Sequence, residues 1–580
     1  MLPTEIQRIL LLIGLAATGY LMILAWNEDY VQTANTAADV AEAPEVRPII
    51  APSLTDQSTA ETPSAEGAGL ADDLPAPVTE AEDRAPTSET PEADAAGSAE
   101  ARLIKVTTPS LVVWIDRVGG DIVRVTLPKF PLELKTPDTP FLLLNQGEGR
   151  VYVAQSGIVG KDGIDQAGAR PLFSAANQAY TLADPDGSLS VELVAERPGQ
   201  RVTKRFEFKG DDCLIGVTAT VENRGDQPQE MAFFAQIKRD TAPPMGDQPI
   251  FLGPQPFLGA AFTTPETPYE KYSFDDLSDE PFRASMSGGW VAFLQHYFLS
   301  AWVADTNETN NFFGRARPDG TYTVGFTAPQ RTLAPGATGV WNAGLYVGPK
   351  DQRRLEQIAP NLNLTIDYGV LWWIALPLFL LLEWLHAFAA NWGLAIILLT
   401  VIVKLLLFPL TAASYRSMAN MRRVAPEMKR LQERYADDRQ KLSQEMMALY
   451  KKEQVNPLGG CLPMLLPMPI FLALYWVLFE SVELRHAPFM LWIDDLAAMD
   501  PFFVLPLLMG ATMYLQQLMS PAVGDPMQQR IMRIMPVMFT VLFLFFPAGL
   551  VLYWLVNNVI SIGQQWYIMR KTEAAHSGKG

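Results

Sequence analysis

Cysteine and histidine are scarce in this sequence. Its 580 residues include two cysteines, Cys213 and Cys461, and four histidines. The topology inferred below places the two cysteines on opposite sides of a membrane, so they cannot pair. Neither they nor the scattered histidines form a ligand motif. These absences exclude a disulfide framework, and we expect no metal site and no cofactor.

Basic charge is also in short supply, and the excess of acid is concentrated in one segment. The net charge of the chain is −18. Residues 27–101 hold 17 acidic residues against Arg47 and Arg84, a net charge of −15. The remainder is close to neutral, so nothing indicates DNA binding. Because this acidic segment is rich in Ala and Pro and has few aromatics, it cannot offset the entropy of ordering, and we expect a disordered linker.

The chain begins with an apolar run over residues 9–26. Arg8 precedes it, and Glu28 and Asp29 follow it, which favours a cytoplasmic N-terminus. A cleaved signal peptide is the alternative, but no small-x-small cleavage site follows the run. Residues 1–26 are therefore predicted to be a retained transmembrane anchor.

Residues 102–350 show short β-like runs separated by turn signals. Examples are residues 111–115, 201–208 and 321–326. This texture over about 245 residues predicts a large all-β sandwich. No nucleophile elbow or metal-ligand set stands out, so an enzyme is not expected. Core packing and a sugar or peptide groove are the two possible roles for several aromatic residues: Trp290, Phe293, Tyr297 and Trp302.

Residues 391–411 are apolar for about the 20 residues that a spanning helix needs, yet they contain Lys404. At helical spacing Thr400, Lys404 and Thr411 share one face. A lysine at the centre of a spanning helix costs roughly 2.5 to 3.5 kcal/mol, and such charges are by default functional. The alternative is that the Lys404 stem snorkels toward the nearer interface.

The charges of the loops determine the predicted topology. Residues 412–460 hold ten Lys or Arg against six acids, which places them in the cytoplasm. The apolar residues 368–390 then cannot cross the membrane, and we expect them to form an amphipathic helix along the outer interface. Together with the anchor, five further spans give six transmembrane helices with both termini inside: 391–411, 462–482, 502–519, 530–546 and 549–569, followed by a cytoplasmic tail at 570–580.

The basic segment 412–460 is predicted to form a helical hairpin. Apolar residues recur at a/d spacing on both arms, and Asp437 or Asp438 can cap the second arm. Anionic headgroups or ribosomal RNA suit such a surface, and a solvated coiled coil without a partner is the alternative. The basic residues assigned to recruitment are Arg416, Arg422, Arg423, Lys429, Arg430, Arg434, Lys451 and Lys452.

A second polar stripe lies on the last predicted span. Tyr553, Asn557, Ser561 and Gln564 follow helical spacing, and Gln516 lies on a weaker polar face of the 502–519 span. Interhelical hydrogen bonding, about 0.6 kcal/mol per contact, is one interpretation. Polar faces on three spans, one with a cation and without a core carboxylate, favour a hydrated groove. The residues assigned to it are Lys404, Thr400, Thr411, Gln516, Tyr553, Trp554, Asn557, Ser561 and Gln564.

Several local sequences carry a family resemblance. They are FPLT at 408–411, SQEMMALY at 443–450, VNPLGGC at 455–461, PIFLALY at 469–475, DPMQQ at 525–529 and FPAGLVLY at 546–553. The chain resembles the YidC family of membrane insertases of Gram-negative bacteria, within the Oxa/Alb superfamily. The resemblance implies a polytopic α-helical membrane protein with a five-helix insertase core. It also implies a periplasmic β-sandwich similar to sugar-binding supersandwich folds, and a groove open to cytoplasm and lipid. Lys404 stands where the family usually has arginine, Trp554 where a tyrosine is common, and Pro467 where a polar residue is common.

The resemblance further implies function and partners. The expected function is to insert and help fold nascent inner-membrane proteins without nucleotide chemistry, alone or with the Sec translocon and its accessory complex. The ribosome, the signal recognition particle pathway and membrane lipids are the other expected partners. A secondary transporter and a membrane-anchored glycan-binding protein are the alternatives. The chain has no internal repeat to favour the first and no assignable carboxylate pair to favour a glycan-cleaving variant of the second.

Overall fold

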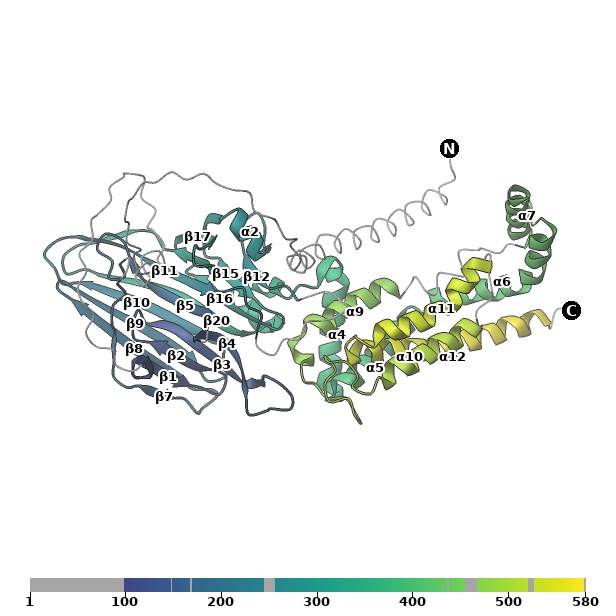
Figure 1. The fold of residues 1–580 in the computed structure, drawn as a ribbon, viewed down its shortest axis with the longest axis horizontal. Coiled ribbons are helices and arrows are strands. Elements are labelled where there is room, and N and C mark those ends of the chain that lie inside the picture. Colours follow the sequence, from purple (N-terminus) through teal and green to yellow (C-terminus); the bar gives the residue numbers. More distant parts are fainter. Residues whose placement is uncertain are drawn as a thin grey trace, which may run out of the picture. The chain divides into compact units, whose positions relative to one another are not determined.

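The computed structural model describes residues 99–147, 149–166, 169–244, 256–435, 438–453, 467–519 and 526–577. The predicted anchor at 1–26 and nearly all of the predicted linker at 27–101 lie outside these residues. Strands fill the purple-to-teal part of the chain in Figure 1, and long helices fill the green-to-yellow part. The change from strand to helix follows the change in the sequence from period-2 runs to long apolar segments.

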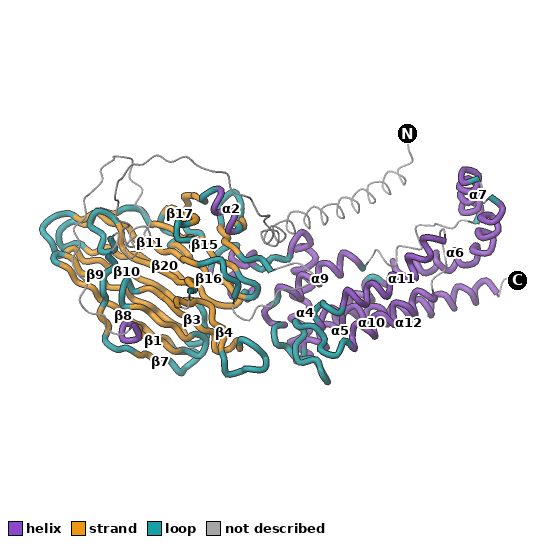
Figure 2. Tube along the Cα trace, viewed as in Figure 1, coloured by secondary structure: helices purple, strands orange, loops and turns teal. Residues whose placement is uncertain are grey.

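Two antiparallel sheets make up the β domain (Figure 2). The first, of eleven strands, has the order β14-β17-β18-β11-β5-β4-β3-β2-β1-β7 with β19 paired to β11. The second, of nine, has the order β13-β12-β15-β16-β20-β10-β9-β8-β6. Among the described strands β1 and β7 form the one parallel pair. The strands are β1 (Leu103–Thr107), β2 (Val112–Asp116), β3 (Asp121–Pro131), β4 (Pro140–Gly147), β5 (Arg150–Val159), β6 (Ser174–Ala175), β7 (Ala179–Thr181), β8 (Ser188–Arg197), β9 (Gln200–Lys209), β10 (Leu214–Asn223), β11 (Gln229–Arg239), β12 (Gly259–Phe262), β13 (Glu270–Tyr272), β14 (Phe282–Ser287), β15 (Trp290–Leu294), β16 (Phe298–Ala304), β17 (Thr309–Ala316), β18 (Tyr322–Thr327), β19 (Arg331–Leu333) and β20 (Thr338–Pro349).

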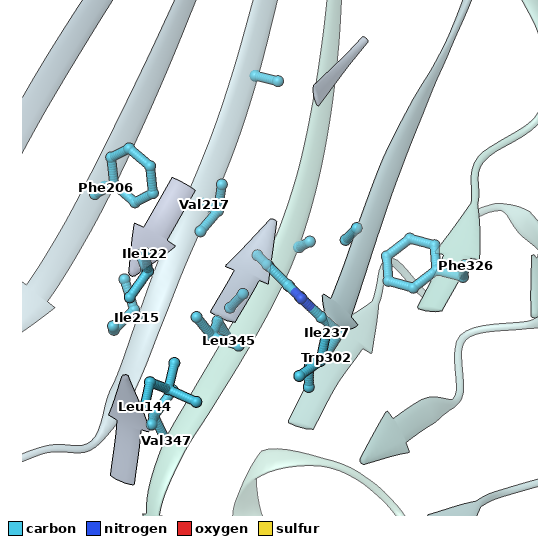
Figure 3. Close-up of a cluster of buried hydrophobic side chains, with 14 of the residues drawn as sticks. Ile122, Leu144, Phe206, Ile215, Val217, Ile237, Trp302, Phe326, Leu345 and Val347 are labelled. Carbon is cyan, nitrogen blue, oxygen red and sulfur yellow. The ribbon is translucent and has the colours of Figure 1, made fainter. Parts of the chain in front are cut away.

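The core between the sheets follows from alternation along the strands. On β9 the residues Val202, Phe206 and Phe208 are buried while their neighbours are less so. Figure 3 shows side chains of β10 and β20, such as Val217 and Leu345, meeting others from β3 and β4. Such an interior supplies most of the stabilisation, at about 25 cal/mol for each Å² of apolar surface removed from water. The three example runs at 111–115, 201–208 and 321–326 coincide with β2, β9 and β18, so the predicted β domain is confirmed.

The aromatic residues considered for a groove are mostly core residues. Trp290, Phe293 and Trp302 are buried, and Trp302 Nε1 donates a hydrogen bond to the backbone oxygen of Gln236 at 3.0 Å. Tyr297 is half-buried and stacks on His296, with ring centroids 3.8 Å apart. Core packing, the first of the two predicted roles, therefore applies to the three buried residues.

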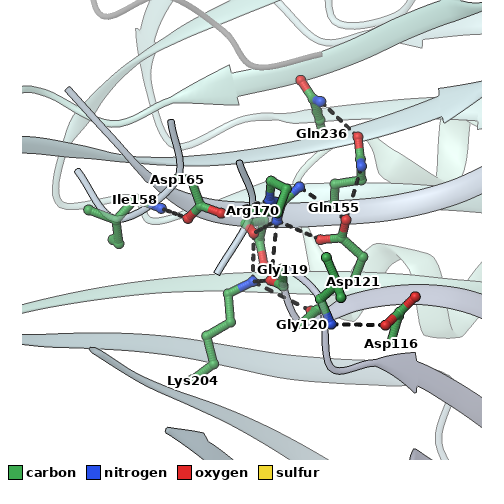
Figure 4. Close-up of polar contacts among 12 residues, drawn as sticks. Asp116, Gly119, Gly120, Asp121, Gln155, Ile158, Asp165, Arg170, Lys204 and Gln236 are labelled. Carbon is green, nitrogen blue, oxygen red and sulfur yellow. Dashed lines mark hydrogen bonds and ion pairs between the residues drawn. The ribbon is translucent and has the colours of Figure 1, made fainter. Parts of the chain in front are cut away.

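A charged network lies inside the β domain (Figure 4). The Arg170 guanidinium contacts Asp121 Oδ1 at 2.8 Å and Asp165 Oδ1 at 2.6 Å. Burial alone would lower the pKa of Arg170, but Asp121 and Asp165 outweigh burial and raise it. Lys204 Nζ donates to the backbone oxygens of Gly119 at 2.7 Å and Ser156 at 2.5 Å. Burial lowers the pKa of Lys204 to about 8, with Asp121 and Asp165 opposing that shift. Each buried charge thus has partners.

The second half of the described chain is helical. α4 packs on α5 and α9, α10 packs on α11 and α12, and α12 also packs on α5 and α6. Asn391 caps α5, its side chain accepting from the Leu394 amide at 3.0 Å. The helices are α2 (Phe274–Asp279), α3 (Gln352–Ile358), α4 (Trp372–Ala389), α5 (Trp392–Leu406), α6 (Phe408–Arg434), α7 (Arg439–Lys452), α9 (Met468–Glu480), α10 (Val504–Met519), α11 (Pro526–Phe543) and α12 (Ala548–Ser577).

The predicted helix at 391–411 is wrong at its C-terminal end. The chain breaks at Leu407, and α5 and α6 meet at an angle of 66°. Pro409 explains the break, because it has no N–H to donate to the turn before it and its ring clashes with the carbonyl four residues earlier, while it fits well in the first turn of a new helix. Thr411 therefore belongs to α6, not to the helix of Thr400 and Lys404.

Helix lengths do not by themselves establish the predicted six spans. Among the described residues, Gly369–Ala389 is the one unbroken helix that meets the length and hydropathy expected of a membrane span, and α5 with α6 meets them as a bent pair. The predicted interfacial segment 368–390 corresponds to this first helix. α12 continues to Ser577, so most of the predicted tail at 570–580 is helical. The number of spans stays a prediction.

Candidate functional site

Lys404 lies inside the helical bundle and contacts α12. Its side chain is 5% exposed, and Nζ donates to Ser561 Oγ at 2.7 Å. Ser561 Oγ in turn donates to the backbone oxygen of Asn557 at 2.7 Å. Next to it, Asn558 Nδ2 donates to Thr512 Oγ1 on α10 at 3.3 Å. The predicted polar faces of α5 and α12 therefore meet at Lys404, and the polar face of α10 contacts α12 at Asn558.

This buried ammonium lacks a counter-ion. Within the described residues no carboxylate forms an ion pair with Lys404, and Ser561 Oγ is the one acceptor recorded for its three N–H donors. A hydroxyl can orient the ammonium but cannot neutralise it. An isolated cation in an apolar bundle is costly, so the site favours any anionic or strongly polar group that reaches it.

Two of the predicted groove residues do not offer their hydroxyl protons to a ligand. Thr400 Oγ1 donates to the backbone oxygen of Ile396 at 2.7 Å. Thr411 Oγ1 contacts the backbone oxygens of Leu407 and Phe408, each at 3.1 Å. Such bonds to the preceding turn are common for threonine in helices. Gln516 and Gln564 are half-buried on α10 and α12.

Tyr553 and Trp554 belong to a different cluster. Trp554 meets Phe471 edge-on with ring centroids 4.4 Å apart, and Tyr553 stacks on Phe471 at 6.4 Å. Phe543 lies 5.6 Å from Trp554. Tyr553 precedes Ser561 by eight residues on α12, roughly 12 Å of helix. Of the nine predicted groove residues, Lys404, Asn557 and Ser561 therefore lie together in a polar cluster. Tyr553 and Trp554 lie in an aromatic cluster toward the start of α12.

The polar cluster is completed by Asn558, described above, and by Tyr415 and Gln565. Tyr415 is buried on α6 and hydrogen-bonds to Ser561. Gln565 Nε2 donates to Met418 Sδ at 3.5 Å. We call Lys404, Tyr415, Asn557, Asn558, Ser561 and Gln565 the Lys404 cluster. Tyr415 and Met418 were missed from the sequence, although they follow Thr411 at i+4 and i+7 on one helix face.

Outside this cluster the bundle presents apolar side chains. The exposed residues on α5, α10, α11 and α12 include large aliphatic and aromatic groups. This is the reverse of a water-soluble bundle, in which polar residues face outward. These exposed residues are Leu394, Leu398, Val401, Leu405, Leu507, Leu508, Leu515, Leu518, Ile534, Val537, Val541 and Val559.

The basic hairpin is built as its spacing predicts. Met421, Val424 and Met428 of α6 pack against Leu449 of α7. Asp438 caps α7, its carboxylate accepting from the Lys441 amide at 2.9 Å. The eight basic residues predicted for recruitment are exposed around this apolar seam. Their charge is thus available to a partner without loss of the hairpin core.

Comparison with known proteins covers both halves of the chain. Residues 103–381 match the family described as YidC periplasmic domain, and residues 384–575 match the family described as 60Kd inner membrane protein. A membrane protein insertase YidC from Marinobacter nauticus is 49% identical over 578 residues, which cover 99% of this chain and 100% of that protein. The membrane protein insertase YidC from Stutzerimonas stutzeri is 47% identical over 573 residues, which cover 98% of this chain and 99% of that protein. A solved structure of an active YidC insertase is 18% identical, covers 80% of this chain and 92% of that chain, and superposes with a TM-score of 0.36.

An apolar outer surface around a buried polar cluster, joined to a β-sandwich, defines a helical membrane protein with a large extramembrane domain. The full-length relatives make the assignment specific. The chain belongs to the YidC family of membrane protein insertases, inner-membrane proteins with a periplasmic β domain.

Proposed function

We propose that the Lys404 cluster is where this insertase receives the polar outer segment of a substrate. The observation that carries the proposal is the buried Lys404 ammonium, held by Ser561 and without a carboxylate partner among the described residues. An acidic side chain or a backbone carbonyl of the substrate supplies the missing acceptor. The interaction is transient, because a polar segment that later reaches water regains its hydration.

The apolar part of the substrate follows a separate path. The exposed aliphatic residues of α5 and α10, such as Leu398 and Leu508, offer a surface along which an apolar segment slides into lipid. Transfer of that segment releases about 25 cal/mol for each Å² of apolar surface, so no covalent or nucleotide chemistry is required. The role of the cluster is to lower the desolvation cost of the polar end.

The proposed topology has six spans with both termini in the cytoplasm and the β domain in the periplasm. α4 lies along the outer interface with its exposed tryptophans Trp372, Trp373 and Trp384 at headgroup level. The positive charge of residues 412–460 supports their cytoplasmic side. Cysteine accessibility from each side of intact spheroplasts tests each loop.

The groove itself is tested by site-specific crosslinking. A photoreactive residue at position 400 or 557 is expected to crosslink to the polar outer segment of a stalled nascent chain, because both positions line the interior beside Lys404. A probe at Leu405, on the exposed face of the same helix, is the matched control and is expected to capture the apolar segment or lipid. Equal crosslinking of the polar segment from all three positions would contradict the proposal.

The hairpin is proposed to recruit the translating ribosome, the targeting particle or the Sec translocon. Reversing Arg422, Lys429 and Arg430 to glutamate is expected to reduce cosedimentation with translating ribosomes at least tenfold at low salt, since phosphate contacts dominate such binding. These side chains are exposed, so the seam of Met421, Val424, Met428 and Leu449 is retained.

The matched control reverses Glu427 and Glu433 on the same arm to lysine, which is expected to preserve or strengthen binding. If the variant of Arg422, Lys429 and Arg430 bound ribosomes as well as the original chain does, the hairpin would not be the surface that recruits them. Arg423 is left in place because it pairs with Glu453 across the hairpin at 3.0 Å.

A further inference from the structure

The segment between α9 and α10, residues 481–503, carries a feature that its composition conceals. We call it the outer loop. Its acids suggest a hydrated loop, but the carboxylates of two of them turn inward onto backbone amides. Asp495 accepts from the amides of His486 at 3.1 Å and Ala497 at 2.8 Å. Asp500 accepts from Trp492 Nε1 at 3.0 Å and from the amide of Leu505 at 2.7 Å. These bonds hold the loop in a defined shape.

The other charges beside the loop are also turned toward protein. Arg485 donates to the backbone oxygen of Leu132 at 2.9 Å and lies over the Phe298 ring. Glu480, at the end of α9, forms a buried ion pair with Lys350 at 3.1 Å. Burial raises the pKa of Glu483 to about 7, so its negative charge is diminished at neutral pH. Of the acids in the outer loop, only Asp494 is exposed.

Large apolar side chains take the outward positions. Leu491 is 81% exposed and Phe502 is 67% exposed, and Met490, Met499 and Phe503 are also exposed. Leu491 and Phe503 have left-handed backbone, each with φ of 57°. A bulky residue in this region is strained, and such strain persists where a function requires it. The backbone at Leu491 is held by the turn around it, in which the Ile493 amide donates to the Met490 oxygen at 3.1 Å, while the Leu491 side chain itself stays exposed.

The outer loop is fixed next to other exposed apolar surfaces. The amides of Ala548 and Gly549, at the start of α12, donate to loop oxygens at 2.7 and 2.9 Å. Asn391 Nδ2 donates to the Phe489 oxygen at 3.0 Å, which joins the loop to the end of α4, where Phe388 is 83% exposed. After Phe503 the chain enters α10 directly. The exposed apolar residues of the loop therefore continue the apolar surfaces of α4 and α10.

We infer that the outer loop is a lipid anchor whose residues Met490, Leu491, Met499, Phe502 and Phe503 insert at the boundary between headgroups and acyl chains of the outer leaflet. The partner is the bilayer itself. A rigid loop with inward charges and outward apolar groups suits this boundary, since it inserts without ordering cost. The anchor would hold the outer ends of α9, α10 and α12 at one depth while substrates pass.

Depth-dependent quenching in vesicles tests the inference on the full chain. Cys213 and Cys461 are changed to serine, and a single Leu491→Cys is labelled with an environment-sensitive fluorophore. In vesicles of phosphatidylethanolamine and phosphatidylglycerol, a lipid carrying a nitroxide near its headgroup is expected to quench this label at least threefold more than a label at Asp494→Cys. Aqueous iodide is expected to show the reverse order.

Phe502→Cys gives the second measurement and is expected to behave as Leu491→Cys does. Equal iodide quenching at positions 491 and 494 would overturn the inference. So would a label at 491 that neither quencher reaches, because that result means a protein surface covers the loop. Leu491→Gly suits the left-handed backbone and is expected to fold normally. Its normal folding would show that the loop keeps its structure when the Leu491 side chain is removed. The readout needs no insertion activity and is independent of the role proposed for Lys404.

Discussion

Replacing Lys404 by glutamate is expected to lower the insertion of a substrate with an acidic outer segment by at least tenfold. Lys404 is buried with Ser561 as its recorded partner, so its charge is poorly screened. A unit charge pair about 4 Å apart at an effective dielectric of about 20 is worth about 4 kcal/mol, and a tenfold change needs only about 1.4 kcal/mol. Insertion into reconstituted vesicles, scored by protease protection of the outer segment, measures the effect.

The decisive control is the charge of the substrate. A matched substrate with a basic outer segment is expected to insert better into vesicles carrying Lys404→Glu than into those with the original chain. Lys404→Arg is expected to retain most activity, because the charge is kept and only the geometry of the donor group changes. If Lys404→Glu impaired acidic and basic substrates equally, the electrostatic step would have to be abandoned in favour of a structural role.

Replacing Arg170 by methionine is expected to destabilise the β domain by about 3 to 5 kcal/mol, because Asp121 and Asp165 lose the cation between them. Both carboxylates lie in the interior, and Lys204 already directs its ammonium at the backbone oxygens of Gly119 and Ser156. The measurement is thermal unfolding of the full chain in detergent, with the susceptibility of the β domain to proteolysis as the readout.

Arg205→Met is the matched control for this loss. Arg205 pairs with Glu192 across β8 and β9, but both side chains are about half exposed, and such surface pairs contribute about 0 to 1 kcal/mol. If Arg170→Met and Arg205→Met lowered the midpoint temperature equally, the buried network would not contribute more to stability than a surface pair.

The β domain could be predicted because the sequence of many strands alternates in the same way as the burial of their side chains. Alternation in β9 assigns Val202 and Phe206 to the core, and no long-range information is needed. The same alternation also places Lys204 on the core face. The buried Lys204 ammonium finds its acceptors in the carbonyls of Gly119 and Ser156, which are more than 40 residues away in the sequence. Spacing along one strand cannot show these partners.

The candidate site was predictable only in part. Helical spacing identified Lys404, Asn557 and Ser561 as members of polar faces, and the structure brings these faces together. Spacing did not show that Thr400 turns its hydroxyl onto its own helix, or that Tyr553 joins an aromatic cluster. Both outcomes depend on which neighbour a side chain meets. The break at Leu407 was predictable in principle, since Pro409 is plain in the sequence.

That break has a mechanical consequence. α6 is a continuous helix of 27 residues, about 40 Å long, with Tyr415 against Ser561 near one end and the Met428 seam near the other. The turn at Leu407 is a pivot point between α5 and α6. If a partner binds the hairpin as proposed, we expect its pull to act along α6 on the first turns of that helix, beside the hydroxyl that orients Lys404. The proposed docking surface and the tyrosine that contacts Ser561 thus lie toward opposite ends of one helix.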